Sequence, residues 1–88
     1  MEFRWNEWNL EHIGRHGVEP EEVESVVRAA RRPWPEERDD DKWLVWGATL
    51  QGRLLQVIYL LEDDRERASV IHARPLTPRE KRRHRRRA

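Results

Sequence analysis

The sequence lacks cysteine altogether, contains few apolar residues and has no long apolar run. Without cysteine, neither a disulfide framework nor a cysteine-ligated metal site can form. Hydrophobic residues make up 36% of the chain and charged residues 40%, a balance close to that of chains that do not fold alone. The opening segment lacks the apolar core of a signal peptide, and no segment is long and apolar enough to cross a bilayer. We therefore expect a soluble, cytoplasmic protein.

The length limits the chain to one small domain. Its 88 residues suffice for a single modest core, and no internal repeat divides them. Five tryptophans offset the low apolar content, because each indole can bury a large area. We expect one domain over residues 1–88 that ends in a basic tail over residues 78–88.

The charges are distributed unevenly along the chain. Residues 79–87 hold seven Lys and Arg against one Glu, a net charge of +6, so the rest of the chain carries −5 to give the overall +1. An acidic body with a basic tail indicates a polyanionic partner for the tail, such as a nucleic acid or an acidic protein. The alternative is a solvated tail without a specific role.

The first part of the sequence predicts a strand and two helices. Residues 2–5 alternate as in a short strand, and Asn6 is a suitable N-cap for a helix over residues 7–16, which Gly17 can close. Pro20 suits the first position of a second helix. The apolar residues of that helix recur at helical spacing, as Val23, Val26, Val27 and Ala30.

The second part predicts a sheet. Two apolar runs, residues 42–50 and 53–62, are separated by Gln51 and Gly52, which is typical of a hairpin. A third strand follows over residues 68–73. Thr77 can cap a last helix, with Glu80 at capping-box spacing, but this helix has almost no apolar face and can equally be frayed or disordered.

This order of elements predicts an α+β fold. We expect an antiparallel β-sheet meander with the two N-terminal helices on one face and a short basic C-terminal helix. Trp43 and Trp46 are three apart on one strand and therefore should face opposite ways. We expect Trp5 and Trp8 to staple the first helix to the sheet. Trp34 stands between prolines in an extended connection, and we expect it to be exposed and to contact a protein partner.

Three segments of the sequence resemble the BrnT family of toxins. The opening is similar to that family's F-x-W-(D/N) start and its K-H-G-V step, the middle to its I-G-x-(4)-G-R-x-L-x-V-V-Y hairpin, and the end to its R-I-I-S-A-R-x-A-T-x-x-E-R-x-x-Y closing segment. The matching residues are Arg15, His16, Gly17 and Val18 at the front, Gly47, Gly52, Arg53, Leu55, Val57 and Tyr59 in the middle, and Ile71, Ala73, Arg74, Thr77 and Glu80 at the end.

The resemblance implies a fold, an activity and a partner. BrnT toxins adopt the fold of RelE-type ribonuclease toxins, so it implies a RelE-like domain that cleaves mRNA and inhibits translation. It also implies neutralisation by a cognate BrnA-like antitoxin, which carries the DNA-reading element, so that DNA is contacted only through the complex. No cofactor and no metal are expected.

The sequence departs from the family pattern at the closing segment. His72 stands where the family has Ser, and His84 stands where it has the closing Tyr. These two departures favour an alternative in which the fold persists and the chain only binds RNA or a partner. A third hypothesis is an interaction module that meets an acidic protein through its tail.

RNA cleavage without a metal needs a base for the 2′-hydroxyl, an acid for the leaving oxygen and a cation for the phosphorane. His suits the acid–base role, and the planar fork of Arg suits the phosphate. His72 and Arg74 are two apart on one predicted strand, so their side chains should share a face. We expect His72 or His84 to act as the acid–base group and Arg74 to hold the phosphate.

Further residues complete the predicted site. Arg53 opens the neighbouring strand and is a candidate second phosphate contact, whereas Glu80 and His84 are four apart on one helical face near the strand exit. The cations that would guide RNA to the site are Arg79, Lys81, Arg82 and Arg83. Arg74 and His72 also have plainer interpretations: Arg74 can pair with an acidic residue, and His72 can be a hydrogen-bonded strand residue.

Two other histidines lie near the first helix. His16, just before Gly17, is more typical of a helix end that favours the dipole than of a catalyst. His12 is expected at the surface. The two are four residues apart, but no third ligand and no H-E-x-x-H pattern accompany them, so a metal site is not predicted.

Overall fold

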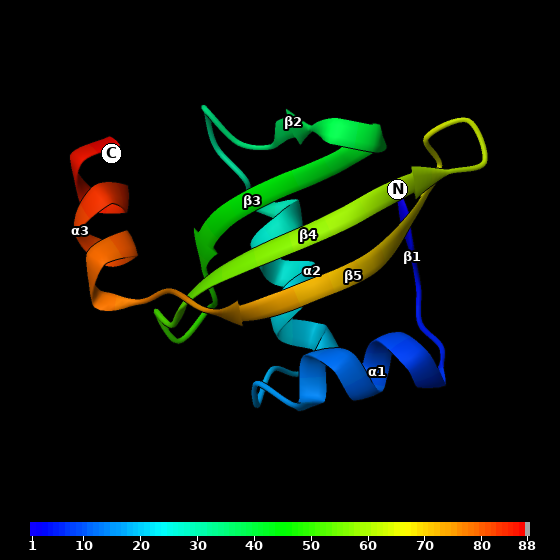
Figure 1. Cartoon of the computed structure of the whole chain (residues 1–88), viewed down its shortest axis with the longest axis horizontal. Coiled ribbons are helices and arrows are strands. Elements are labelled where there is room, and N and C mark those ends of the chain that lie inside the picture. The colour runs from blue at the N-terminus through cyan, green and yellow to red at the C-terminus, as the bar shows by residue number, and fades with distance from the viewer. Residues whose placement is uncertain (88) are drawn as a thin grey trace.

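The chain folds into one sheet with two helices packed on it and a third at its end (Figure 1). The computed structural model describes residues 1–87, without the side chains of Asp40 and Arg87, so Ala88 of the predicted tail lies outside the described residues. The elements are β1 (Glu2–Arg4), α1 (Glu7–Gly14), α2 (Pro20–Arg28), β2 (Glu36–Arg38), a 3₁₀ turn (Asp39–Asp41), β3 (Lys42–Ala48), β4 (Leu54–Glu62), β5 (Arg67–Pro75) and α3 (Pro78–Arg87). The predicted α+β class is confirmed.

The five strands lie in the order β1-β5-β4-β3-β2. Strands β3 to β5 form the predicted antiparallel meander, β2 adds an antiparallel edge strand to β3, and Gly52, with a φ of 87°, lies in the turn between β3 and β4. The expectation of a wholly antiparallel sheet is wrong, because β1 pairs parallel to β5 and places Phe3 opposite Ala68. Since the helices carry the chain from one edge of the sheet to the other, β1 finds its partner in the last strand.

Asparagine side chains organise the start of α1. Asn6 caps the helix, and the side chains of Asn6 and Asn9 each accept the backbone N–H of the other, which completes a capping box. Asn9 is only 1% exposed, and its Nδ2 donates to the Arg4 carbonyl at 2.7 Å. The helix ends at Gly14, two residues before the predicted end. The buried side chain of Asn9 therefore connects β1 to α1.

The predicted stripe of α2 forms the centre of the core. Val23, Val26 and Val27 are buried, and they belong to one cluster with alternate residues of the sheet. In β4 the buried residues are Leu55, Val57 and Tyr59, whereas the intervening Leu54, Gln56 and Ile58 are only half-buried. The period of two therefore gives the sheet one face toward the core and a second, more accessible face.

The tryptophans correct two expectations. Trp34 is only 7% exposed and lies 5.4 Å, ring centre to ring centre, from Trp46, so the prediction of an exposed Trp34 is wrong. Trp8 is 52% exposed and stacks on His12 instead of holding α1 to the sheet. Trp5 packs on the core and donates to Glu24 of α2 at 2.8 Å. An indole between two prolines meets a second indole that is distant in sequence, which local composition cannot reveal.

None of the helices formed by residues 1–87 is long and apolar enough to cross a membrane. The C-terminal basic segment is helical, and the expected capping box between Thr77 and Glu80 is present. In Figure 1, α3 stands beside the sheet at the end where β5 finishes.

We predict that Asn9→Ala lowers the free energy of unfolding by about 2 kcal/mol, because the Arg4 carbonyl and the Asn6 amide lose their buried partner. Urea denaturation followed by circular dichroism measures this change. Leu10→Ala, on the neighbouring exposed position of the same helix, is the control and should change stability by less than about 0.5 kcal/mol. Equal effects of the two substitutions would contradict the role given to Asn9.

Candidate functional site

Four polar or aromatic side chains lie together on the second face of the sheet. Trp46 of β3 lies opposite Gln56 of β4, which in turn lies opposite Arg74 of β5. His72 stands two residues before Arg74 and contacts Gln56 from β5. The prediction that His72 and Arg74 share a face is therefore confirmed. We call these four residues, Trp46, Gln56, His72 and Arg74, the cross-strand row.

Hydrogen bonds within the cross-strand row determine the tautomer of His72. Nε1 of Trp46, which can only donate, lies 2.9 Å from Oε1 of Gln56 and thus orients the amide. Nε2 of Gln56 then donates to Nε2 of His72 at 3.2 Å. The neutral imidazole of His72 therefore carries its proton on Nδ1. Sequence reasoning missed Gln56, because its place beside His72 depends on the register of two strands.

Burial of the His72 ring lowers its pKa below the usual 6.5, and the positive charge of Arg74 and the nearby His16 act in the same direction. Glu80 opposes this change only in part. Because the Gln56 amide also donates to the unprotonated nitrogen, it favours the neutral form. At neutral pH His72 is thus a neutral hydrogen-bond donor through Nδ1.

His16, which the sequence places at the end of the first helix, lies next to His72 in the structure. Its ring centre lies 6.0 Å from that of His72, with the rings tilted at 59°. The side chain is exposed, and its ring nitrogens make no hydrogen bond within residues 1–87. The signal that marked it was the Arg15-His16-Gly17-Val18 step shared with the family pattern.

Arg74 makes a two-pronged ion pair with Glu80 at the start of α3. Nη1 and Nη2 donate to the two carboxylate oxygens at 2.7 and 2.8 Å, and Nη1 also donates to the Pro75 carbonyl at 3.1 Å. The guanidinium holds the pKa of Glu80 down to about 2, and the Thr77 amide and hydroxyl help. The same bond raises the pKa of Arg74. The plainer interpretation, that Arg74 pairs with an acidic residue, is thus confirmed.

The ion pair leaves part of the Arg74 guanidinium available. A guanidinium has five N–H donors, and three of them are used by Glu80 and Pro75. The two that remain, on Nε and Nη2, form the side edge of the fork. This edge has the geometry to bind two oxygens of one phosphate.

Helix α3 lies along the cross-strand row. Glu80 contacts Arg74, and one turn later the His84 ring lies edge-on to Trp46 at 6.2 Å. The Arg83 guanidinium lies 5.7 Å from the centre of the same indole. The predicted common face of Glu80 and His84 is confirmed. Of the cations expected to guide RNA, Arg79, Arg82 and Arg83 are exposed and Lys81 is half-buried.

The side chain of Arg53 is held by the turn between α1 and α2 and makes no contact with Arg74 among the described residues. Its Nη1 donates to the Gly17 carbonyl at 2.8 Å and to Glu22 at 3.1 Å, and its Nη2 donates to the His16 carbonyl at 3.4 Å. The structure therefore does not bring it to Arg74 as a second phosphate contact. It holds the turn between α1 and α2, and with it the backbone of His16.

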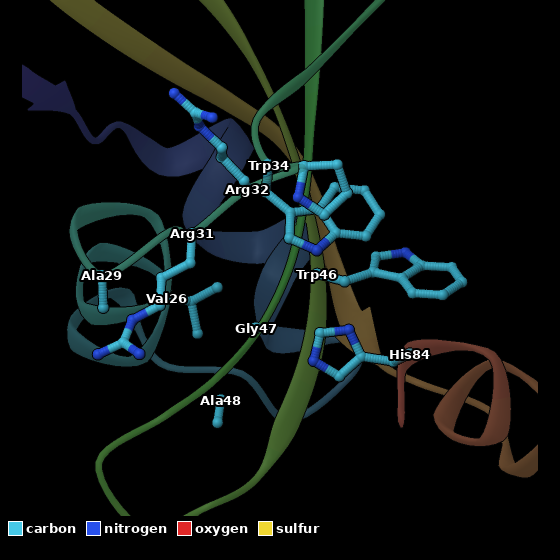
Figure 2. A pocket seen from close by; sticks show the side chains of 10 residues that line it. Val26, Ala29, Arg31, Arg32, Trp34, Trp46, Gly47, Ala48 and His84 are labelled. Carbon is cyan, nitrogen blue, oxygen red and sulfur yellow. The ribbon is translucent and has the colours of Figure 1, made fainter. Parts of the chain in front are cut away.

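A cavity of about 510 Å³ opens beside the cross-strand row, at the part of β3 that β2 leaves unpaired. Figure 2 shows small aliphatic side chains of α2 and β3 on one side and the indoles of Trp34 and Trp46 on the other. The imidazole of His84 reaches from α3 toward Gly47. Its Nδ1 is buried and has no hydrogen-bond partner among the described residues.

Comparisons with protein-family models, with curated proteins and with solved structures find no match. Within residues 1–87, apart from the side chains of Asp40 and Arg87, no group of three His, Asp or Glu side chains is arranged to hold a metal ion. The geometry of the cross-strand row and of α3 is therefore the evidence for the function of this chain.

We predict that the carboxyl of Glu80 titrates near pH 2 in the native protein and that Arg74→Ala raises its pKa toward 4.5, with Thr77 still holding it below that value. Because the folded pKa is lower than the unfolded one, the pair stabilises the fold above about pH 4.5, and this contribution is lost as the pH falls toward 2. Carboxyl NMR titration measures both values. An unchanged pKa in Arg74→Ala would show that Arg74 is not the cause.

We also predict that Gln56→Glu raises the pKa of His72, because a carboxylate beside Nε2 stabilises the imidazolium that the amide disfavours. NMR titration of the imidazole measures the change. Gln51→Glu, at an exposed turn position, is the matched control and should leave His72 unaltered. If Gln56→Glu lowers the pKa or leaves it constant, the assigned tautomer is wrong.

Proposed function

We propose that this chain is a metal-independent endoribonuclease with a RelE-like fold, the toxin of a BrnT/BrnA-type toxin–antitoxin pair that cleaves mRNA and inhibits translation in the cytoplasm. The observation that supports it best is the chain of contacts that runs from α3 through Arg74 and His72 to His16. Arg74, whose side edge has no partner among the described residues, contacts a helix whose exposed side chains are mostly cationic, and His72 on the same face as Arg74 lies 6.0 Å, ring centre to ring centre, from His16. These are the groups that attack by a 2′-hydroxyl on its own phosphodiester requires.

Each side chain has a chemical role in this proposal. The Nε–Nη2 edge of Arg74 binds the non-bridging oxygens and stabilises the charge that develops on the phosphorane. His72 donates from Nδ1 to a phosphoryl oxygen and so orients it. This replaces the acid–base role first expected of His72, since its Nε2 lone pair already accepts from Gln56.

His16 is the group suited to accept the proton of the 2′-hydroxyl, because neither of its ring nitrogens has a hydrogen-bond partner among the described residues. The new bond joins the 2′-oxygen to phosphorus, the bond to the 5′-oxygen breaks, and the leaving oxygen takes a proton from water. Arg53 holds the His16 carbonyl and thereby positions the turn that carries this imidazole. Arg79, Lys81, Arg82 and Arg83 attract the polyanionic strand.

A second candidate function is RNA binding without cleavage. The observation that favours it is the occupied fork of Arg74, whose end-on donors are both held by Glu80. In this second function the phosphate still binds the side edge of Arg74, but its phosphodiester bond is not broken. The two candidates share the RNA surface and differ only in the chemical step.

We predict that the purified protein cleaves free or ribosome-bound mRNA, and that Arg74→Ala slows cleavage by about 10²–10³-fold, the range for loss of one charge-stabilising donor. His16→Ala and His72→Ala should also slow it. The rate is measured from the appearance of 5′-labelled fragments. His12→Ala and Arg38→Ala, whose side chains lie away from the cross-strand row, are the matched controls and should cleave at the wild-type rate.

The same variants separate the two candidate functions in cells. Induced expression of the wild type should arrest growth, and co-expression of the cognate antitoxin should restore it, whereas Arg74→Ala should be harmless. Tight RNA binding without any cleavage would favour the binding-only function. Wild-type cleavage by both Arg74→Ala and His16→Ala would overturn the proposed chemistry.

A further inference from the structure

We propose that the cavity between α2, β3, the segment at residues 31–35 and α3 binds one unpaired nucleobase, with the imidazole of His84 as its hydrogen-bonding partner. The proposal rests on RNA as the ligand, as proposed above, but not on cleavage. The RNA-binding surface would then contain a site for a base in addition to a site for a phosphate.

The size and walls of the cavity suit a flat, mostly apolar ring. About 510 Å³ lies in the range of small-ligand sites and exceeds what a single base needs. Two indoles, Trp34 and Trp46, form one wall, and small side chains, among them Ala48, form the other (Figure 2). Gly47 allows this close arrangement, since a Cβ there would lie 3.2 Å from a methyl of Val26.

One polar side chain that lines the cavity, the imidazole of His84, has no hydrogen-bond partner among the described residues. Neither nitrogen of the His84 imidazole makes a hydrogen bond within the described residues. Nδ1 is buried, so Nε2 is the atom that a ligand in the cavity can reach. A nucleobase edge carries both N–H donors and acceptor atoms, so it can pair with Nε2 of His84 in either tautomer. An apolar peptide side chain of the same size would leave this atom unpaired, which favours a base over a protein side chain.

The cavity lies within one nucleotide's reach of the proposed phosphate site. Trp46 and Arg74 are separated by one intervening strand, which places their backbones about 10 Å apart. A sugar and its phosphate span a comparable distance. The same helix serves both ends, because Glu80 contacts Arg74 and His84 contacts Trp46.

The rim of the cavity is cationic. In Figure 2 the guanidinium groups of Arg31 and Arg32 point away from the middle of the cavity, and Arg83 lies over the indole of Trp46 on the side of α3. A strand that leaves a base in the cavity therefore carries its phosphates past positive side chains. A neutral small molecule would make no use of these charges.

The experiment compares binding of a short 2′-O-methyl RNA, which cannot be cleaved, with versions in which each base in turn is removed. For the wild type we expect one position at which base loss weakens binding about tenfold, as for loss of one stacked base. Ala48→Leu, an exposed position that lines the cavity, should abolish this difference by filling the space. Ala48→Ser keeps the volume small and is the control that should retain it. Fluorescence anisotropy of a labelled strand measures all affinities.

The outcomes separate this proposal from the nuclease proposal. Arg74→Ala should weaken binding at every position yet keep the preference for the base, and His84→Phe should reduce discrimination between bases. A preference for the base without any cleavage would support the cavity proposal and overturn the proposed nuclease activity. Cleavage by the wild type with no loss of affinity at any abasic position, or a preference that survives in Ala48→Leu, would overturn the cavity proposal. If all strands bind equally and an acidic tryptophan-containing peptide competes with them, the cavity is instead assigned to a protein partner.

Discussion

The two-pronged ion pair between Arg74 and Glu80 is the contact on which the arrangement of the C-terminal third depends. Helix α3 consists almost entirely of charged residues and brings no apolar stripe to the sheet, so the hydrophobic effect cannot hold it. Its place is determined by this pair, by the edge-on contact of His84 with Trp46 and by the Arg83 guanidinium over the same indole. Each contact joins the helix to one end of the cross-strand row.

This mode of attachment gives one side chain two roles. Arg74 anchors α3 through its end-on donors, and its side edge remains free for an anion. Binding of a phosphate and docking of α3 therefore need not compete, because they use different edges of the same planar group. The strongly lowered pKa of Glu80 keeps its carboxylate charged at any physiological pH, so the anchor does not loosen with ordinary changes of acidity.

The parts of the fold that local pattern determines were predictable, and those that depend on distant pairing were not. The valine stripe of α2, the turn at Gly52 and the cap formed by Thr77 and Glu80 depend on neighbours in sequence, and each is confirmed. The period of two likewise placed His72 and Arg74 on one face. The parallel partner of β1, the burial of Trp34 and the approach of His16 to His72 all join segments far apart in the chain. The spacing of residues along the sequence does not predict such contacts.

The Gln56 amide connects the two proposed subsites by a physical route. It accepts from Trp46, which lines the cavity, and donates to His72, which faces the proposed phosphate site. An indole that shifts when the cavity fills must carry the amide with it or lose this bond. Loss of the amide bond frees Nε2 of His72 and removes one of the causes that keep the imidazole neutral. We therefore expect occupation of the cavity to alter the protonation of His72 through three side chains on adjacent strands.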